Sequence, residues 1–213
     1  MAAELANKMT LSIAVIDPND LNPTISPKFH SRVSAITPAS IDFLKSINVW
    51  NELERKNAFE ATKVWDQNSH GRLNFHAKDE GMEYLGYIVE NDVIQSALYR
   101  ATKPSTATMI QASLVELIAT DVGYKVVLNN DQTLSCKLLI GADGPQSKVR
   151  SLANIEFKEQ NYNQSAIIAN VLTEKPLNKT TWQRFLSDSI LAFLPLSDHQ
   201  ASIVWSCKNS LAN

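Results

Sequence analysis

Asp143 stands in the stretch of sequence best suited to chemistry, a turn with two glycines that follows an apolar run. The run, residues 138–140, is followed at once by Gly141, and this length and punctuation predict a short, fully buried strand. Gly141 and Gly144 allow the backbone to bend sharply or to approach a ligand closely. Because ligands bind at the carboxyl ends of strands in open α/β sheets, the Asp143 carboxylate is well placed for sugar hydroxyls.

Ser147 is predicted to begin a helix just after this turn. Its hydroxyl suits an N-cap, and the free backbone N–H groups at a helix start favour a nearby phosphate or pyrophosphate. A simpler explanation stays open, because short Gly/Asp motifs are common in turns. Taken alone, Asp143 is more simply explained as a capping or solvated residue.

A second acid, Asp17, closes the apolar run 11–16 and precedes Pro18. In a dinucleotide-binding βαβ unit, the acid that holds the ribose closes the second strand, about 20 residues after a glycine-rich loop. Only sixteen residues precede Asp17, so such a unit would have its first strand and glycine loop before Met1, with residues 1–9 as the connecting helix. Taken alone, Asp17 is explained by an Asp-Pro turn. Taken together, Asp17 and Asp143 predict that both carboxylates bind one sugar at the tips of neighbouring parallel strands.

The longer pattern over residues 141–150, Gly-Ala-Asp-Gly-x-x-Ser-x-Val-Arg, resembles the second fingerprint of a known superfamily. This superfamily comprises the FAD-dependent aromatic hydroxylases, which are similar to p-hydroxybenzoate hydroxylase. The resemblance implies that Asp143 is associated with the FAD ribose and with the pyridine nucleotide, and that Gly144 lies beside it in the cofactor site.

Two further segments resemble the ubiquinone-biosynthesis hydroxylases within that superfamily. Residues 32–40 read Arg-Val-Ser-Ala-Ile-Thr-Pro-Ala-Ser, and residues 85–91 read Leu-Gly-Tyr-Ile-Val-Glu-Asn. The resemblance implies that Arg32 approaches the flavin and that Asn91 touches it. Without the resemblance, Arg32 is a surface cation, and capping of the helix predicted after Asn91 explains that residue nearly as well.

The expected fold is α/β. The resemblance implies a partial Rossmann-like FAD-binding domain, lacking the first strand and glycine loop, formed by residues 1–60 and 91–155. It is interleaved with a mainly antiparallel substrate-domain sheet formed by residues 61–90 and 156–213. Local patterns predict a helix that begins at Thr37-Pro38, a hairpin within residues 63–77, a turn at 129–132, and strands near 162–171 and 203–206.

The sequence departs from the family pattern in two ways. Residues 186–190 read Leu-Ser-Asp-Ser-Ile where relatives show a Pro and a Gly-Pro, so a loop near the pocket is expected to differ. The glycine-rich first fingerprint and the third fingerprint, a Gly-Asp followed by an Ala-His segment, have no counterpart in the 213 residues. The chain therefore resembles the middle of a protein roughly twice as long, and weak or no FAD binding by the chain alone is expected.

Composition restricts the partners. A formal charge of −2 with scattered Lys and Arg residues argues against nucleic acid. Cys136 and Cys207 form no disulfide framework, which favours a reducing compartment. His70 and His76 have no partners at ligand spacing, so no metal site is assigned. No apolar run reaches the ~18 residues of a membrane span, so a cytoplasmic location is expected, with peripheral contact at the inner membrane left open.

The resemblance implies a fragment of an FAD-dependent, NAD(P)H-using monooxygenase that hydroxylates a polyprenyl phenol or quinol ring in ubiquinone biosynthesis, inactive by itself. FAD would carry the chemistry, and no residue stands out as an acid, base or nucleophile, so none is assigned as catalytic. Two alternatives to this expectation stay open. The first is a non-enzymatic remnant or interaction module in a ubiquinone-biosynthesis protein complex. The second is a part of a different FAD-dependent oxidoreductase.

Overall fold

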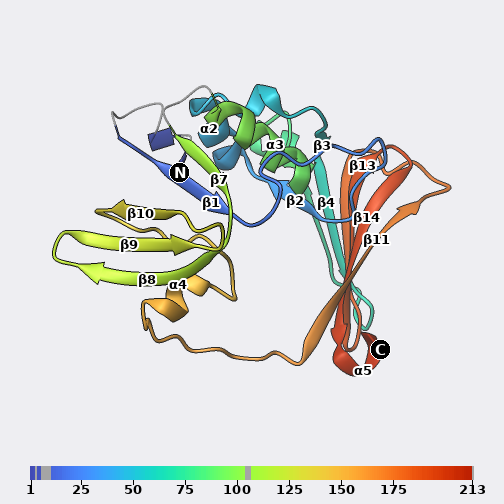
Figure 1. Cartoon of the computed structure of the whole chain (residues 1–213). Helices are drawn as coiled ribbons and strands as arrows, with labels where there is room; N and C mark the ends of the chain where they lie inside the picture. The colour runs from blue at the N-terminus through green and yellow to red at the C-terminus, as the bar shows by residue number, and fades with distance from the viewer. Residues whose placement is uncertain (3, 6–10, 104–106, 213) are drawn as a thin grey trace. The chain divides into compact units, whose positions relative to one another are not determined.

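The computed structural model describes residues 1–2, 4–5, 11–103 and 107–212, which form two compact units (Figure 1). Unit 1 comprises Met1–Asn22 and Thr102–Gln160, and unit 2 comprises Pro23–Ala101 and Asn161–Asn213. Most of the helix expected at residues 1–9 lies outside the described residues. The units reflect packing within the chain, so the functional domain boundaries expected from the sequence stay a prediction.

Unit 1 contains two small sheets. Strands β1 (Ala14–Asp17) and β7 (Thr108–Gln111) pair in parallel, whereas β8 (Leu114–Thr120), β9 (Gly123–Leu128) and β10 (Thr133–Cys136) form an antiparallel sheet. The predicted turn at 129–132 is confirmed, because it joins β9 to β10. The buried core of unit 1 is small and consists of Ala112, Val126 and Leu128, with partly buried apolar side chains around them.

The buried strand predicted at residues 138–140 is wrong. This segment is not part of any sheet among the described residues, and the side chains of Leu138 and Ile140 are 73% and 46% exposed. Only Leu139 packs against the core of unit 1. A strand needs a neighbour for its backbone N–H and C=O groups, and the apolar run alone could not reveal whether one lies alongside.

Unit 2 begins with a three-stranded antiparallel sheet in the order β2-β6-β3. These strands are β2 (Val33–Ile36), β6 (Gly86–Glu90) and β3 (Asn57–Phe59). Helix α2 (Pro38–Ser46) has Thr37 as its N-cap and proline in its first turn, as predicted. Helix α3 (Asn91–Thr102) follows β6 directly, and η1 (Trp50–Glu52) and η2 (Ala77–Glu80) are short 3-10 turns.

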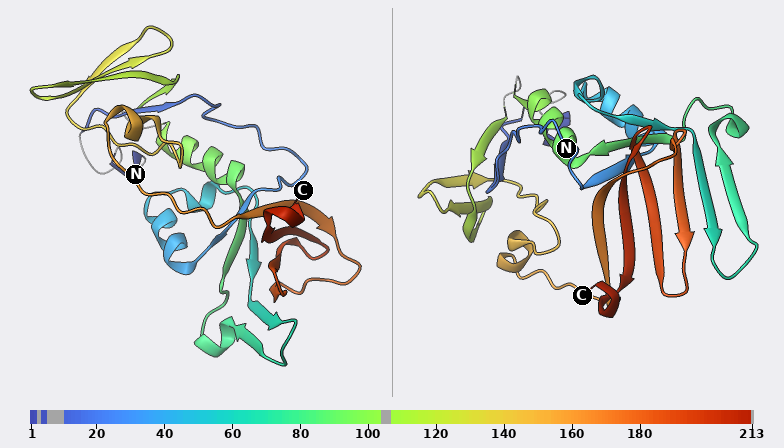
Figure 2. Two further views of the ribbon diagram at one scale, coloured as in Figure 1. Left: turned by 90° about the horizontal axis from the view of Figure 1, so that it is seen from below. Right: turned by 90° about the vertical axis from the view of Figure 1, so that its right-hand side faces the viewer.

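The larger sheet of unit 2 has six strands in the order β11-β14-β13-β12-β4-β5, which lie side by side in Figure 2. The strands are β4 (Ala61–Asp66), β5 (Arg72–His76), β11 (Gln164–Leu172), β12 (Thr180–Phe185), β13 (Ser189–Ser197) and β14 (Gln200–Lys208). The β4–β5 hairpin and strands β11 and β14 were predicted. The parallel pairing of β4 with β12 joins segments 119 residues apart, and α5 (Asn209–Ala212) follows β14.

Within the described residues, no helix is long and apolar enough to span a membrane.

Candidate functional site

Asp17 ends strand β1, as predicted. Its Oδ1 accepts two hydrogen bonds from Asn19, one from the backbone N–H and one from the side-chain amide, both 2.9 Å long. The carboxylate is half-buried beside the β1–β7 pair, where Asp17 is the register partner of Gln111. This arrangement suits a sugar-binding acid and equally an Asp-Pro turn, so the role of Asp17 stays a prediction.

Asp143 holds the start of helix α4 (Lys148–Leu152). Its Oδ1 accepts from the Ser147 hydroxyl, and its Oδ2 accepts from the backbone N–H groups of Lys148 at 2.6 Å and Val149 at 3.1 Å. Ser147, the predicted N-cap, accepts from the N–H of Arg150. The expectation of free amides for a phosphate is therefore wrong here, because the first three N–H groups of α4 already donate within the chain.

The two glycines of this turn serve different ends. A side chain at Gly141 would bring a Cβ within 3.1 Å of Val149, so glycine allows the turn to pack closely on α4. Gly144 has a φ of 83°, which side chains rarely adopt, but a Cβ built there would contact no neighbouring atom. Glycine is therefore favoured at this position by the backbone conformation and not by lack of space. Gly144 and Asp143 thus lie together in one ordered turn, and their contact with a cofactor stays a prediction.

Changing Asp143 to Asn tests this capping role. Burial alone would raise the pKa of Asp143, but hydrogen bonds from Ser147 and from backbone N–H groups outweigh it and hold the pKa below its ordinary value. The carboxylate's stabilisation of α4 is therefore present above the ordinary aspartate pKa and is lost as pH falls through the lowered one. We expect D143N to destabilise α4 by about 1 kcal/mol, measured by amide hydrogen exchange at Lys148 and Val149.

The matching titration gives the contradicting outcome. Carboxyl ¹³C shifts of Asp143 should report a pKa below the ordinary aspartate value, and the protection of the Val149 amide against exchange should fall over the same pH range. An Asp143 pKa at or above the ordinary aspartate value would contradict the capping interpretation.

Arg32 and Asn91, the other two predicted cofactor residues, meet in unit 2. Strands β2 and β6 place Val33 opposite Glu90, and the backbone N–H of Asn91 donates to the carbonyl of Arg32 at 3.1 Å. The Asn91 side-chain oxygen accepts from the Ser34 hydroxyl at 2.8 Å. The Arg32 side chain is exposed, so the structure brings this predicted pair together and leaves the guanidinium accessible.

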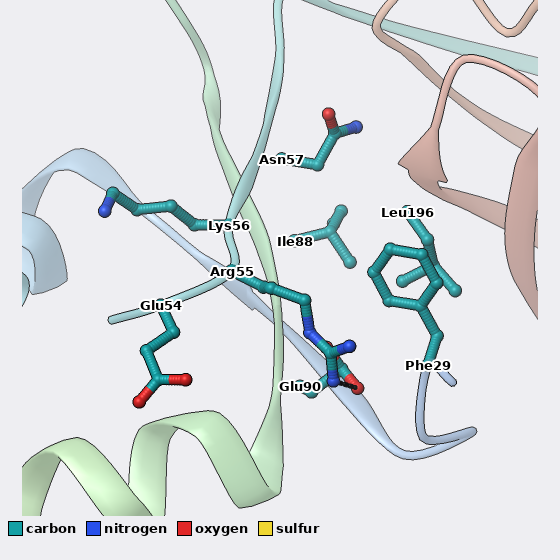
Figure 3. A pocket seen from close by; sticks show the side chains of 8 residues that line it. All are labelled: Phe29, Glu54, Arg55, Lys56, Asn57, Ile88, Glu90 and Leu196. Atoms are coloured by element: carbon teal, nitrogen blue, oxygen red, sulfur yellow. Dashed lines mark hydrogen bonds and ion pairs between the residues drawn. The ribbon is translucent and has the colours of Figure 1, made fainter. Parts of the chain in front are cut away.

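The sequence reasoning missed an ion pair next to these residues, in which the carboxylate is buried and the Arg55 side chain is 26% exposed. Arg55 Nη2 donates to Glu90 Oε1 at 2.8 Å, and the side chain of Glu90 is only 3% exposed (Figure 3). Oε1 also accepts from the N–H of His30 at 2.7 Å. The available signal was Glu90 itself, since an acid that closes an apolar run needs a buried partner when the run is buried.

A cavity of about 210 Å³ adjoins this pair. Phe29, Ile88 and Leu196 contribute apolar lining, and Asn57, Arg55 and Glu90 contribute polar lining (Figure 3). Glu90 Oε2 and Arg55 Nε are buried without a hydrogen-bond partner among the described residues. A side-on, two-bond arrangement of the same ion pair would satisfy both atoms.

The five predicted site residues therefore fall into two groups. Unit 1 contains Asp17, Asp143 and Gly144, and unit 2 contains Arg32 and Asn91. Among the residues with described positions, no cluster of three or more His, Cys, Asp or Glu side chains could hold a metal ion.

Comparison with known proteins identifies the family. The profile of the FAD-binding domain family matches residues 21–212. The chain is 35% identical to the 3-demethoxyubiquinol 3-hydroxylase of Escherichia coli over 178 residues, which is 82% of this chain and 45% of the relative. It is 36% identical to ubiquinone biosynthesis monooxygenase COQ6 of Mus musculus over 208 residues, 88% of this chain and 42% of the relative. The chain thus spans less than half the length of these relatives.

Solved structures show the same fold at low identity. Pseudomonas aeruginosa PqsL in complex with 2-aminobenzoylacetate matches with a TM-score of 0.80 and 15% identity over 99% of this chain and 58% of the other. Klebsiella pneumoniae HpxO complexed with FAD and uric acid matches with a TM-score of 0.71 and 12% identity over 95% of this chain and 57% of the other. The expected mixed α/β fold with antiparallel sheets is confirmed, and the chain belongs to the FAD-binding domain family within the FAD-dependent monooxygenase superfamily.

Proposed function

We propose that the chain forms part of an FAD-dependent, NAD(P)H-using monooxygenase that hydroxylates a polyprenyl phenol or quinol ring in ubiquinone biosynthesis. The observation that carries this proposal is the 35% identity, over 82% of the chain, to a demethoxyubiquinol hydroxylase. The COQ6 relatives of mouse and human, which are 36% and 34% identical, support the same pathway. A polyprenylated substrate is confined to a membrane, so we also propose contact with the membrane surface and with other proteins of the pathway.

The residues present fit FAD in part. Arg32 offers an exposed cation beside Asn91 for the flavin end of the cofactor, and Asp17 offers a carboxylate at a strand end for the ribose. The Asp143 carboxylate already accepts hydrogen bonds from Ser147, Lys148 and Val149, so a ribose hydroxyl would have to share or replace these donors. Bound FAD would supply the redox chemistry, with electrons from NAD(P)H, while these residues bind and orient it.

We propose that the chain alone binds FAD weakly and does not hydroxylate. It covers 42–45% of the mouse and E. coli relatives, and residues 138–140 belong to no strand among the described residues. Strand β1 pairs only with β7 among the described strands. A sheet of this kind needs more strands to position a cofactor at its carboxyl edge.

The test is a comparison of two polypeptides. The 213-residue chain and the product of its reading frame extended through the flanking DNA are assayed with FAD, NADPH, oxygen and a short-chain prenylphenol. We expect only the extended product to retain stoichiometric flavin and to form hydroxylated ring product. Flavin retained stoichiometrically by the chain alone would contradict the weak binding. NADPH oxidation without ring product would instead favour a different FAD-dependent oxidoreductase.

A second candidate is a non-catalytic interaction module. Stop codons in the flanking DNA on both sides, together with stable production of the chain in its host, would support this alternative over the monooxygenase.

A further inference from the structure

The segment of residues 27–32, which leads into β2, has an irregular backbone that is held at almost every position. Asn170 Nδ2 on β11 donates to the carbonyl of Phe29 at 2.7 Å, and Ser202 Oγ on β14 donates to the carbonyl of Ser31 at 3.0 Å. Ser202 is fully buried. Two strands of the large sheet therefore fix this segment through buried or half-buried side chains.

The Arg55–Glu90 pair holds the same segment from the other sheet of unit 2. Glu90 Oε1 accepts from the His30 N–H at 2.7 Å, and Arg55 Nη1 donates to the Pro27 carbonyl at 3.2 Å. The guanidinium of Arg55 also lies over the Phe29 ring, 5.0 Å from its centroid. In Figure 3 the Arg55 and Glu90 side chains point toward each other, next to Phe29.

The result is a fixed backbone that carries an exposed cation. The N–H of Arg32 donates to His30 Nδ1 at 3.2 Å and its carbonyl accepts from Asn91 N–H at 3.1 Å, whereas its side chain is exposed. An irregular surface segment would ordinarily lose conformational freedom when a ligand binds, which weakens affinity. Here that freedom is already lost in the folded chain.

We propose that Glu90 and Arg55 are positioning residues that preset Arg32 for the flavin end of the cofactor. This inference rests on the proposed function, because it assigns FAD as the ligand of Arg32. Glu90 acts through the backbone of His30, and Arg55 acts through Pro27 and the Phe29 ring. Neither side chain needs to touch the cofactor.

The informative variant changes both members of the pair, E90Q with R55M. Removing one partner would leave an unpaired buried charge, but the paired change leaves none. The amide introduced at position 90 can still accept from the His30 N–H, whereas the thioether introduced at position 55 cannot donate to Pro27. The matched control is D188N with K208M, which makes the same kind of change in an exposed ion pair of unit 2.

Two readouts separate structure from function. Amide hydrogen exchange of residues 28–32 reports the hold on the segment, and NMR titration of the ¹⁵N-labelled chain with FAD, which tolerates weak binding, reports affinity. We expect exchange in the paired variant to quicken about tenfold and its FAD dissociation constant to rise about as much as in R32A. Adding R32A to the paired variant should change affinity less than about twofold, because both changes remove the same interaction.

The other possible results contradict either the positioning role of Glu90 and Arg55 or the assignment of FAD to Arg32. If exchange of residues 28–32 is unchanged, or if the paired variant binds FAD as tightly as the control while R32A binds more weakly, the positioning role is wrong and the proposed function stands. If FAD shifts no signal of the wild-type chain, or if R32A binds as the wild type does, the assignment of FAD to Arg32 fails and the positioning role fails with it.

Discussion

Changing Glu90 to Ala is expected to lower the free energy of unfolding of unit 2 by about 2–3 kcal/mol. This is less than for a fully buried pair, because the Arg55 side chain that loses its partner is 26% exposed and keeps part of its hydration. The variant leaves the Arg55 charge without its carboxylate and the His30 N–H without its acceptor. Tryptophan fluorescence during urea unfolding measures the effect on unit 2 alone, since all four tryptophans, Trp50, Trp65, Trp182 and Trp205, belong to it.

The matched control is E60A, the same substitution in an exposed ion pair. Glu60 Oε1 lies 2.6 Å from Lys179 Nζ, closer than in the Glu90–Arg55 pair, yet both side chains are about half exposed. Solvent and salt screen such pairs, so E60A should unfold as the wild type does. Equal unfolding midpoints for E90A and E60A would show that the buried Glu90 contributes no more to the free energy of unfolding than an exposed ion-paired glutamate does.

Changing Gly123 to Ala is expected to destabilise unit 1 by about 3 kcal/mol or more, through strain that L residues cannot relieve. A Cβ at Gly123 would lie 2.1 Å from the carbonyl oxygen of Cys136, and its φ of 147° is one that side chains rarely adopt. The atom in the way belongs to the backbone, so relief requires β9 and β10 to separate. Hydrogen exchange of β9 and β10 amides in increasing urea measures the loss.

G144A is the control for the backbone conformation of Gly123. Gly144 also has a positive φ, 83°, and belongs to unit 1, but a Cβ there would meet nothing within 4 Å. Its cost should be limited to about 1–2 kcal/mol. If G123A costs no more than G144A, the close contact with Cys136 carries no penalty and β10 is free to move.

Local signals predicted the elements that depend on local physics. Thr37 and Pro38 begin α2 because an N-cap and a first-turn proline need no distant partner. The turn at 129–132 and the N-cap at Ser147 are confirmed for the same reason. Residues 138–140 have the composition of a buried strand, but strand formation depends on a neighbour that composition does not specify.

The candidate site shows the same division. The motifs around Arg32 and Asn91 lie 59 positions apart, and the structure joins them through a β2–β6 ladder. The pairing of Arg55 with Glu90 spans 35 positions, and no local pattern marks Arg55 as different from the exposed Lys and Arg residues around it. Asp17 ends strand β1 as expected, but Asp143 follows residues 138–140, which form no strand, so the predicted meeting of the two acids at the tips of neighbouring parallel strands is wrong. Their binding of one sugar stays a prediction.

The parallel pairing of β4 with β12 has a consequence for how the protein is made. Thr62 and Thr181 meet across this pair, 119 residues apart, and ribosomes add roughly 5–20 residues each second. On the order of ten seconds therefore pass after β4 leaves the exit tunnel before its parallel neighbour exists. During that interval the nascent chain carries an open strand edge, which can pair with other chains and aggregate until β12 covers it.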